Sequence, residues 1–184
     1  MLGAVNTWIA LFRGINVGGH GILPMKKLVA LLEGLGCRNV ATYIQSGNAV
    51  FQSAEADAGK LTKRIEAAVK AGCGFEPRVL VLSAGELQKA ARANPFPQAR
   101  EAPQFVHLMF LAEAPQGPNV AALKQAKTSS ENFALKGKVF YLYTPDGAGN
   151  SRLAGRAEHW LGVAATGRNW NTVTKLIEMA KAAE

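Results

Sequence analysis

A glycine-rich stretch, FRGINVGG at 12–19, carries residue types that are well suited to hold a ligand. Arg13 ends an apolar run, and Gly14, Gly18 and Gly19 lead from it towards a helix-like segment. A glycine loop between a strand and a helix can present backbone N–H groups to a phosphate. The spacing matches neither a P-loop nor a dinucleotide-binding fingerprint. The stretch indicates an anion site or, with equal weight, a structural turn.

A second polar segment, TGRNWNT at 166–172, combines an arginine, asparagines and a tryptophan. Arg168 could bind a phosphate or carboxylate through two parallel hydrogen bonds. Trp170 could stack on a base or sugar, or it could anchor the loop on the core. We expect Asn171 or Thr172 to cap the last helix, which is a sufficient structural role for one of them.

Helix starts give a further indication of anion binding. Lys26 and Lys27 fall in the first turn of a helix that is expected to open at Pro24, and Arg152 falls in the first turn of a later helix. Cations are unfavourable near a helix N-terminus, so an anionic ligand would complete such a site. Water and salt offer the alternative solution.

Groups for catalysis are few. Among the three histidines, His20 is the only candidate, because it lies in the glycine loop. Gln45 and Ser46, in the segment QSGN, could reach a ligand or serve only a turn. No motif of a metal site or an activated nucleophile occurs. We therefore expect no metal and no cofactor, and the sequence leaves open whether the protein is an enzyme.

Composition is that of a globular protein with a basic surface. The chain has 184 residues, 48% of them hydrophobic, and a net charge of +8 shared by both halves. Such a charge attracts anions, including nucleic acid, or serves only solubility. No apolar run approaches the ~20 residues that span a bilayer, and no signal peptide is recognised. With Cys37 and Cys73 expected to be free thiols, we expect a cytoplasmic protein without a membrane partner.

The hydrophobic pattern predicts the same series of elements twice. In the first half we expect strands at 7–13 and 78–82, a hairpin around Gly47, and helices at 24–35, 57–71 and 84–93. In the second half we expect strands from Phe105 and at 163–166, a hairpin at 131–143 around Gly137, and helices at 118–125, from Asn150 or Ser151 to Leu161, and at 172–183.

This order, β-α-β-β-α-β-α, contains the split β-α-β-β-α-β unit of ferredoxin-like folds. We therefore predict an α+β protein built by tandem duplication of a ferredoxin-like unit, with two similar packed subdomains at 1–96 and 97–184. The polar, proline-containing segment 94–104 would link them. The alternative is a single α/β sheet whose pattern repeats by coincidence.

Several strings, in their order and spacing, resemble a known family. They are LFRGINVGG, YIQSGNAVF, NPF, SRL and TGRNWNTVTKL. Together they are similar to a bacterial family of unknown function, the domain of unknown function numbered sixteen ninety-seven. The resemblance implies a compact α+β protein with two similar subdomains, and it implies no activity. Family members often carry lysine in the segment where this chain has Arg152, which keeps the charge but alters the geometry.

The physical pattern and the resemblance select the same loops. The candidate ligand-binding residues are Arg13, Asn16, Gly18, Gly19, Gln45, Ser46, Asn48, Ser151, Arg152, Arg168, Asn169, Trp170 and Asn171. They predict binding of an anionic, phosphorylated ligand, either a nucleotide or single-stranded nucleic acid. The alternatives are an enzyme acting on a small phosphorylated or carboxylated substrate, and a structural or protein-interaction module. The sequence leaves open whether the loops of the two halves meet in one site, and the oligomeric state.

Overall fold

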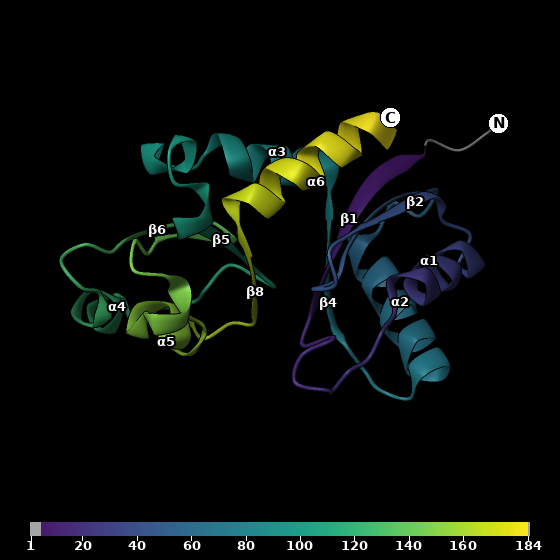
Figure 1. The fold of residues 1–184 in the computed structure, drawn as a ribbon, viewed down its shortest axis with the longest axis horizontal. Helices are drawn as coiled ribbons and strands as arrows, with labels where there is room; N and C mark the ends of the chain where they lie inside the picture. The colour runs from purple at the N-terminus through teal and green to yellow at the C-terminus, as the bar shows by residue number, and fades with distance from the viewer. Residues whose placement is uncertain (1–4, 184) are drawn as a thin grey trace. The chain divides into compact units, whose positions relative to one another are not determined.

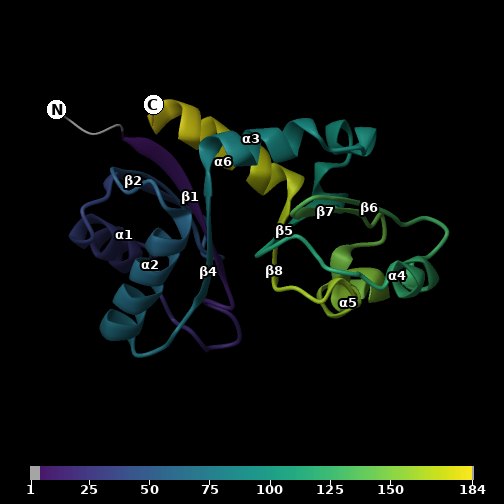
Figure 2. The same ribbon diagram turned by 180° about the vertical axis from the view of Figure 1, so that it is seen from behind.

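Two four-stranded antiparallel sheets, each with helices on one face, form the protein in a computed structural model that describes residues 5–183 (Figures 1 and 2). The first sheet has the order β2-β3-β1-β4, and the second has the order β6-β7-β5-β8. Every neighbouring pair in both sheets is antiparallel. The fold is therefore mixed α+β.

The first sheet is built from β1 (Asn6–Arg13), β2 (Arg38–Tyr43), β3 (Asn48–Ser53) and β4 (Arg78–Ser83). Helices α1 (Met25–Gly34) and α2 (Ala58–Cys73) lie side by side on one face of it. Alternate residues of β1, including Trp8 and Phe12, pack there against Leu28 of α1 and Ile65 of α2. Because side chains alternate along a strand, Ile9, Leu11 and Arg13 lie on the opposite face.

That opposite face is also largely closed to solvent. Ile9 and Leu11 of β1 and Val50 of β3 are buried. Helix α6 (Trp170–Ala183) returns to this part of the chain at its C-terminal end, where the Gln52 Nε2 donates a hydrogen bond of 2.6 Å to the Ala183 carbonyl. The sheet therefore has a core side and a second buried side.

The second sheet consists of β5 (Val106–Leu111), β6 (Asn132–Lys136), β7 (Val139–Tyr143) and β8 (Ala165–Asn169). Helices α4 (Val120–Ala126) and α5 (Arg152–Leu161) lie together on one face. The core between them contains Leu123, Phe140, Leu142, Leu153 and Ala157. Short 3-10 helices lie in the connections at Pro97–Arg100, Pro103–Phe105 and Ala148–Asn150.

The chain divides into two compact units. The first unit runs to Lys89 and resumes at Lys175, and the second unit is Ala90–Thr174. The two boundaries therefore fall inside helices, in α3 (Ala84–Arg92) and in α6.

The expected series of strands and helices is confirmed in both halves. The hairpins turn at Gly47 and Gly137, as predicted, and both glycines have positive φ. Ser83 and Glu86 form a capping box, in which the Ser83 N–H donates to Glu86 Oε2 at 2.7 Å and the Glu86 N–H donates to Ser83 Oγ at 3.2 Å. Ser151, rather than Asn150, caps α5.

Two helix starts differ from the prediction by two residues, and the starts of α1 and α2 differ by one. Helix α4 begins at Val120 rather than Pro118, because the Asn119 side chain accepts a hydrogen bond from the Ala122 N–H. Helix α6 begins at Trp170, because β8 extends to Asn169, beyond the strand expected at 163–166. None of the helices among residues 5–183 has both the length and the apolar character needed to cross a bilayer.

Candidate functional site

The glycine loop and the QSGN turn lie together at one end of the strands of the first sheet. We call this end of the sheet the loop edge. At this edge β1 and β2 end, while β3 and β4 begin. The loop edge comprises the ends of these strands, the connection 14–24 between β1 and α1, and the turn 44–47 between β2 and β3. All the candidate residues of the first half therefore belong to one small region.

Asn16 ties the two segments of the loop edge together. Its Nδ2 donates to the Gln45 carbonyl at 2.8 Å and to the Leu23 carbonyl at 3.0 Å. Its Oδ1 accepts from the Leu23 N–H at 2.8 Å. The residue itself lies in the left-handed region, with a φ of +54°, which asparagine tolerates better than most residues. Asn16 thus positions the loop, whatever else it contacts.

The turn between β2 and β3 is packed tightly beneath the loop. The Phe12 N–H donates to the Gly47 carbonyl at 2.9 Å. A Cβ at Gly47 would lie 2.4 Å from Ile15 Cδ1 and 2.6 Å from Phe12 Cβ, so glycine is required there by space as well as by φ. Asn48 is fully buried, and its Nδ2 donates to the Tyr43 carbonyl at 2.9 Å. Gln45 and Ser46 are exposed.

Two arginines stand opposite each other at the loop edge. Arg13, the last residue of β1, pairs with Arg78, the first residue of β4. Both side chains are exposed, and strand alternation places both on the face opposite α1 and α2. The strand register thus brings two cationic residues to one position of the ladder.

The glycines of the loop adopt backbone conformations that other residues avoid. Gly18 and Gly19 are exposed, with φ of +58° and +78°. A short bridge between Val17 and His20, with the His20 N–H donating to the Val17 carbonyl at 3.0 Å, closes the tip around them. His20 is exposed at this tip. The two glycines and the imidazole at this tip are therefore exposed to solvent.

In the second unit, Ser151 and Arg152 lie at the start of α5. The Ser151 Oγ accepts a hydrogen bond of 3.0 Å from the Ala154 N–H, which is a helix cap. Arg152 follows it and is exposed, and the first turn of α5 contains no acidic residue. The cap accounts for Ser151 structurally, whereas the position of Arg152 is electrostatically unfavourable for the helix.

Arg168 lies near the end of β8, paired with Leu108 of β5. Its side chain is half-buried, and its Nη1 donates to the Gly167 carbonyl at 2.8 Å. Burial lowers the pKa of the Arg168 guanidinium to about 10, which still leaves it protonated at neutral pH. Arg168 thus remains a cation.

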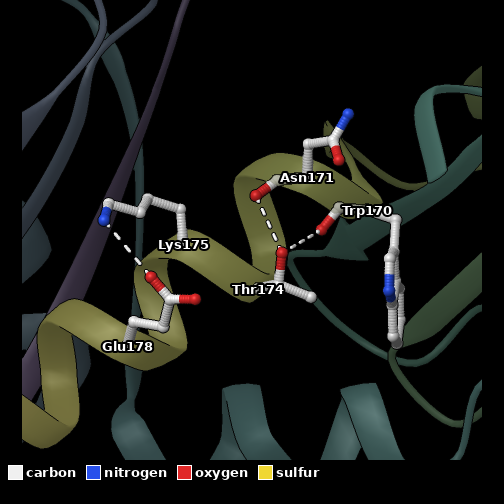
Figure 3. Close-up of polar contacts among 5 residues, drawn as sticks. All are labelled: Trp170, Asn171, Thr174, Lys175 and Glu178. Atoms are coloured by element: carbon white, nitrogen blue, oxygen red, sulfur yellow. Dashed lines mark hydrogen bonds and ion pairs between the residues drawn. The ribbon is translucent and has the colours of Figure 1, made fainter. Parts of the chain in front are cut away.

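The next residues begin the last helix (Figure 3). The Asn169 Oδ1 accepts from the Thr172 N–H at 3.0 Å, so Asn169 caps α6 and the expectation that Asn171 or Thr172 does so is wrong. The Thr174 Oγ1 donates to the carbonyls of Trp170 and Asn171, at 3.0 Å each. The Trp170 indole and the Asn171 amide project from the helix in different directions. The indole is half-buried and the amide is exposed.

The two groups of candidate residues do not lie at equivalent ends of their sheets. The first group lies where β1 ends and β4 begins. In the second sheet, Arg168 and Asn169 lie where β5 begins and β8 ends, and α5 starts after β7 has ended at the same edge. Each unit therefore assembles its own group of candidates.

A cavity of about 570 Å³ opens at the edge of the first sheet opposite the loop edge. Its lining includes Asn6, Trp8 and Ser83 and none of the candidate residues. No group of histidine, cysteine and acidic side chains within residues 5–183 is arranged to hold a metal ion. The cysteines Cys37 and Cys73 are free.

Sequence reasoning missed Arg78 as a partner of Arg13. The sequence predicted the approximate lengths of the two apolar strands that contain these arginines, and it did not predict how the strands pair. A change of register by one residue would have placed Arg78 on the other face of the sheet. It also missed Val17, Ile22 and Ile44, which are exposed at the loop edge. An apolar residue in a loop carries no sign of its exposure in the sequence.

Comparisons with known proteins give the fold and the family. No curated protein matches the sequence. The structure is similar to that of the conserved bacterial protein SP0830 from Streptococcus pneumoniae, with a TM-score of 0.73 and 22% identity, over 96% of this chain and 99% of that one. An unknown protein from Galdieria sulphuraria aligns over 90% of this chain and 99% of that one at 11% identity, with a TM-score of 0.28, too low for an argument about fold.

The likeness to the Streptococcus pneumoniae protein supports the fold alone. The family is established by sequence instead, through a match over residues 5–141, a stretch that includes both segments of the loop edge. On that match, the chain belongs to the family described as "Protein of unknown function (DUF1697)".

Proposed function

We propose that the loop edge binds an anionic ligand that carries a phosphate group. The observation that carries the proposal is the direct pairing of Arg13 with Arg78 at the end of the β1–β4 ladder. Two guanidinium groups held side by side by a sheet can share one phosphate, and each can donate paired hydrogen bonds to it.

The backbone beside the arginines favours the same ligand. Gly14, Asn16, Gly18, Gly19 and Gly21 all have positive φ. Loops of this kind form concave groups of N–H donors that attract anions. Helix α1 begins directly after the loop, with no side-chain cap and no acidic residue in its first turn. The partial positive charge at its N-terminus adds to the local field.

A nucleotide or single-stranded nucleic acid remains the proposed class of ligand. The side chains on the sheet faces favour binding through the loops rather than on the strands. Recognition of bases on a sheet surface needs exposed aromatic side chains on the central strands. On the first sheet, the face away from α1 and α2 carries Ile9, Leu11 and Val50, all aliphatic and buried. On the second sheet, Tyr141 is buried and its hydroxyl donates to the Ala90 carbonyl at 2.8 Å.

Arg152 and Arg168 are two further cations in the proposal. Both lie at one end of the second sheet, with Arg152 exposed at the start of α5 and Arg168 half-buried on the face away from α4 and α5. The neighbouring residues in the sequence, Ser151 and Asn169, already have a sufficient structural role as helix caps. We therefore assign ligand binding in this unit to the arginines, with Trp170 and Asn171 beside them, and stabilisation of the helices to the caps.

We also infer that the two halves of the sequence are copies of one ferredoxin-like element. When the strands are numbered within each unit, both sheets have the order 2-3-1-4, and both series run β-α-β-β-α-β-α. This is the order of a split β-α-β-β-α-β unit. The copies would be the sequence segments 1–96 and 97–184, which differ from the compact units because the chain from Lys175 packs with the first unit.

The proposed function is tested by titrating pyrophosphate into wild-type protein and into three variants, with calorimetric detection. We expect Arg13→Ala and Arg78→Ala each to weaken binding tenfold to a hundredfold, since a hydrogen bond to a charged group contributes about 1.5–3 kcal/mol. Arg38→Ala is the matched control, because Arg38 is an exposed arginine at the opposite edge of the same sheet. Equal binding by all four proteins, or no binding by wild type, would contradict the proposal.

A further inference from the structure

The backbone of β6, an outer strand of the second sheet, has an open side. The ladder between β5 and β7 shows which residues line it, because hydrogen bonds alternate along an antiparallel strand. The Leu111 N–H donates to the Lys138 carbonyl at 2.9 Å, and the Thr144 N–H donates to the Phe105 carbonyl at 2.9 Å. Even-numbered residues of β7 therefore bond to β5, and its odd-numbered residues bond to β6.

Two residues of β6 direct their backbone groups away from the sheet. The odd-numbered residues of β7 pair with Asn132, Ala134 and Lys136. The N–H and C=O groups of the alternate residues, Phe133 and Leu135, therefore point outward. Within residues 5–183, no hydrogen bond reaches these outward groups. An outer strand with open backbone groups is a template for pairing with another strand.

The other outer strands of the two sheets are obstructed. In β4 the outward Val79 N–H donates to Glu66 Oε1 at 3.2 Å. In β8 the Gly167 carbonyl accepts a hydrogen bond of 2.8 Å from Arg168 Nη1. The register of β2 is irregular around Asn39, which has a φ of +50°, and such a bulge bends a strand. Devices of this kind prevent pairing with other chains, whereas β6 keeps a regular register along its whole length.

The residues of β6 suit pairing with a second copy of the same strand. If a two-fold axis passes through Ala134, Phe133 of each copy lies opposite Leu135 of the other copy. All the outward backbone groups of these two residues are then hydrogen-bonded. Asn132 lies opposite Lys136, so like charges do not face each other.

Other positions of the two-fold axis fit less well. An axis at Phe133 directs a hydrogen bond to the Glu131 carbonyl, which already accepts a bond of 2.9 Å from Lys127 Nζ. An axis at Leu135 directs hydrogen bonds to Gly137, which belongs to the hairpin turn. The backbone of β6 therefore favours the axis between these two positions.

The side chains on the helical face favour the same pairing. Phe133 and Leu135 are half-buried and pack against the core beneath α4 and α5. The Phe133 ring stacks on the Phe140 ring, with 5.4 Å between the centroids. Side chains that are directly opposite in an antiparallel pair lie on the same face. The apolar row would therefore continue into the second copy, which would cover the exposed parts of both side chains.

We propose that the protein forms a two-fold dimer, in which the β6 strands of two copies pair antiparallel about Ala134 and join their second sheets. This dimer does not depend on ligand binding at the loop edge. β6 has five residues, and pairing of such short strands covers less than the roughly 1,200 Å² of a stable interface. The net charge of +8 on each copy opposes association at low salt. The dimer therefore forms at high protein concentration and is favoured by salt.

The test is sedimentation velocity on wild type and on charge variants of Ala134, between about 10 µM and 1 mM protein. Ala134→Lys and Ala134→Glu each place two like charges at the axis, so each should weaken the dimer at least about tenfold. An equimolar mixture of the two variants places opposite charges there and should restore the dimer. This restoration also shows that both variants are folded.

Ala41→Lys and Ala41→Glu are the matched controls, because Ala41 is an exposed alanine in β2, an outer strand of the first sheet. Both should dimerise as wild type does. Three results overturn the inference: a wild type that stays monomeric at about 1 mM, a dimer that persists in both Ala134 variants, and a mixture of those variants that stays monomeric.

A cysteine variant gives a readout that needs no added charge. The two Ala134 Cα atoms would form a non-hydrogen-bonded pair about 4.5 Å apart, within the range that a disulfide spans. Oxidation of Ala134→Cys should therefore yield a covalent dimer. Wild type, whose free cysteines are Cys37 and Cys73, should not yield one. A cysteine variant that stays monomeric after oxidation contradicts the inference.

Discussion

The corresponding turns of the two units have the same place in the fold and different constructions. In the second unit, Lys136 pairs with Val139, and Gly137 and Lys138 alone connect the strands. In the first unit, Tyr43 pairs with Asn48, and the chain between them is held by Phe12 and Asn16 from another part of the sequence. Both turns accept one such bond from the first strand of their sheet, since the Leu111 N–H donates to the Lys138 carbonyl at 2.9 Å. The first turn is longer, and only there does a loop side chain, that of Asn16, add a second link.

The polar candidate residues differ in the same way. Ser151 and Asn169 in the second unit each bond to a backbone N–H three residues further on, as helix caps do. Asn16 in the first unit bonds to a carbonyl 29 residues away. A cap stabilises its own helix, while a long-range bond fixes two loops against each other. Asn16 therefore fixes the shape of the loop edge, whereas Ser151 and Asn169 each stabilise a single helix.

The largest effect should come from adding one methyl group to each turn. Gly47→Ala places a Cβ within 2.4 Å of Ile15 at a φ of +83°, so we expect a loss of about 3 kcal/mol or more of unfolding free energy. Gly137→Ala meets no atom within 4 Å and should lose about 1 kcal/mol from backbone strain alone. Urea-induced unfolding of both variants measures the difference. Equal losses would remove the contrast between the turns.

A smaller effect should separate the two asparagines. Asn16→Ala removes three side-chain hydrogen bonds and leaves alanine with positive φ, so we expect a loss of about 2–4 kcal/mol. Asn169→Ala removes one helix cap and should lose about 1 kcal/mol. Asn16→Gly relieves the backbone strain and tests the hydrogen bonds alone. If its stability equals that of wild type, the link between the loops contributes nothing.

The smallest effect concerns pH and belongs to the second unit. Burial lowers the pKa of His107 in β5, and the backbone of Phe105 opposes this shift only in part. A lowered pKa means that the unfolded chain binds the proton more readily, so stability is full above the ordinary pKa near 6.5 and falls as the pH drops below it. The slope is at most about 1.4 kcal/mol per pH unit. Urea unfolding between pH 7.5 and pH 5 measures this slope, and the slope should be flatter in His107→Leu. If the variant keeps the slope of wild type, a group other than His107 causes the pH dependence.

Much of the fold was predictable because its signals are local. Apolar alternation and helical periodicity gave the order of strands and helices, and glycine at positions 47 and 137 marked both hairpins. The capping box of Ser83 and Glu86 was readable because cap residues lie three positions apart. The start of α6 was missed because Asn169, Asn171 and Thr172 are all acceptable caps, and the length of β8 decided among them.

The candidate site was predictable in its residue types and not in its arrangement. The sequence by itself determined the mixed α+β class, a basic chain, and two polar segments of unusual composition, since these follow from composition and local pattern. Only the tertiary structure decided that Arg13 faces Arg78, that Asn16 joins the loop to the turn, and that Ile44 is exposed and strained. Each of these depends on strand register and on contacts between distant segments, and no short stretch of sequence encodes them.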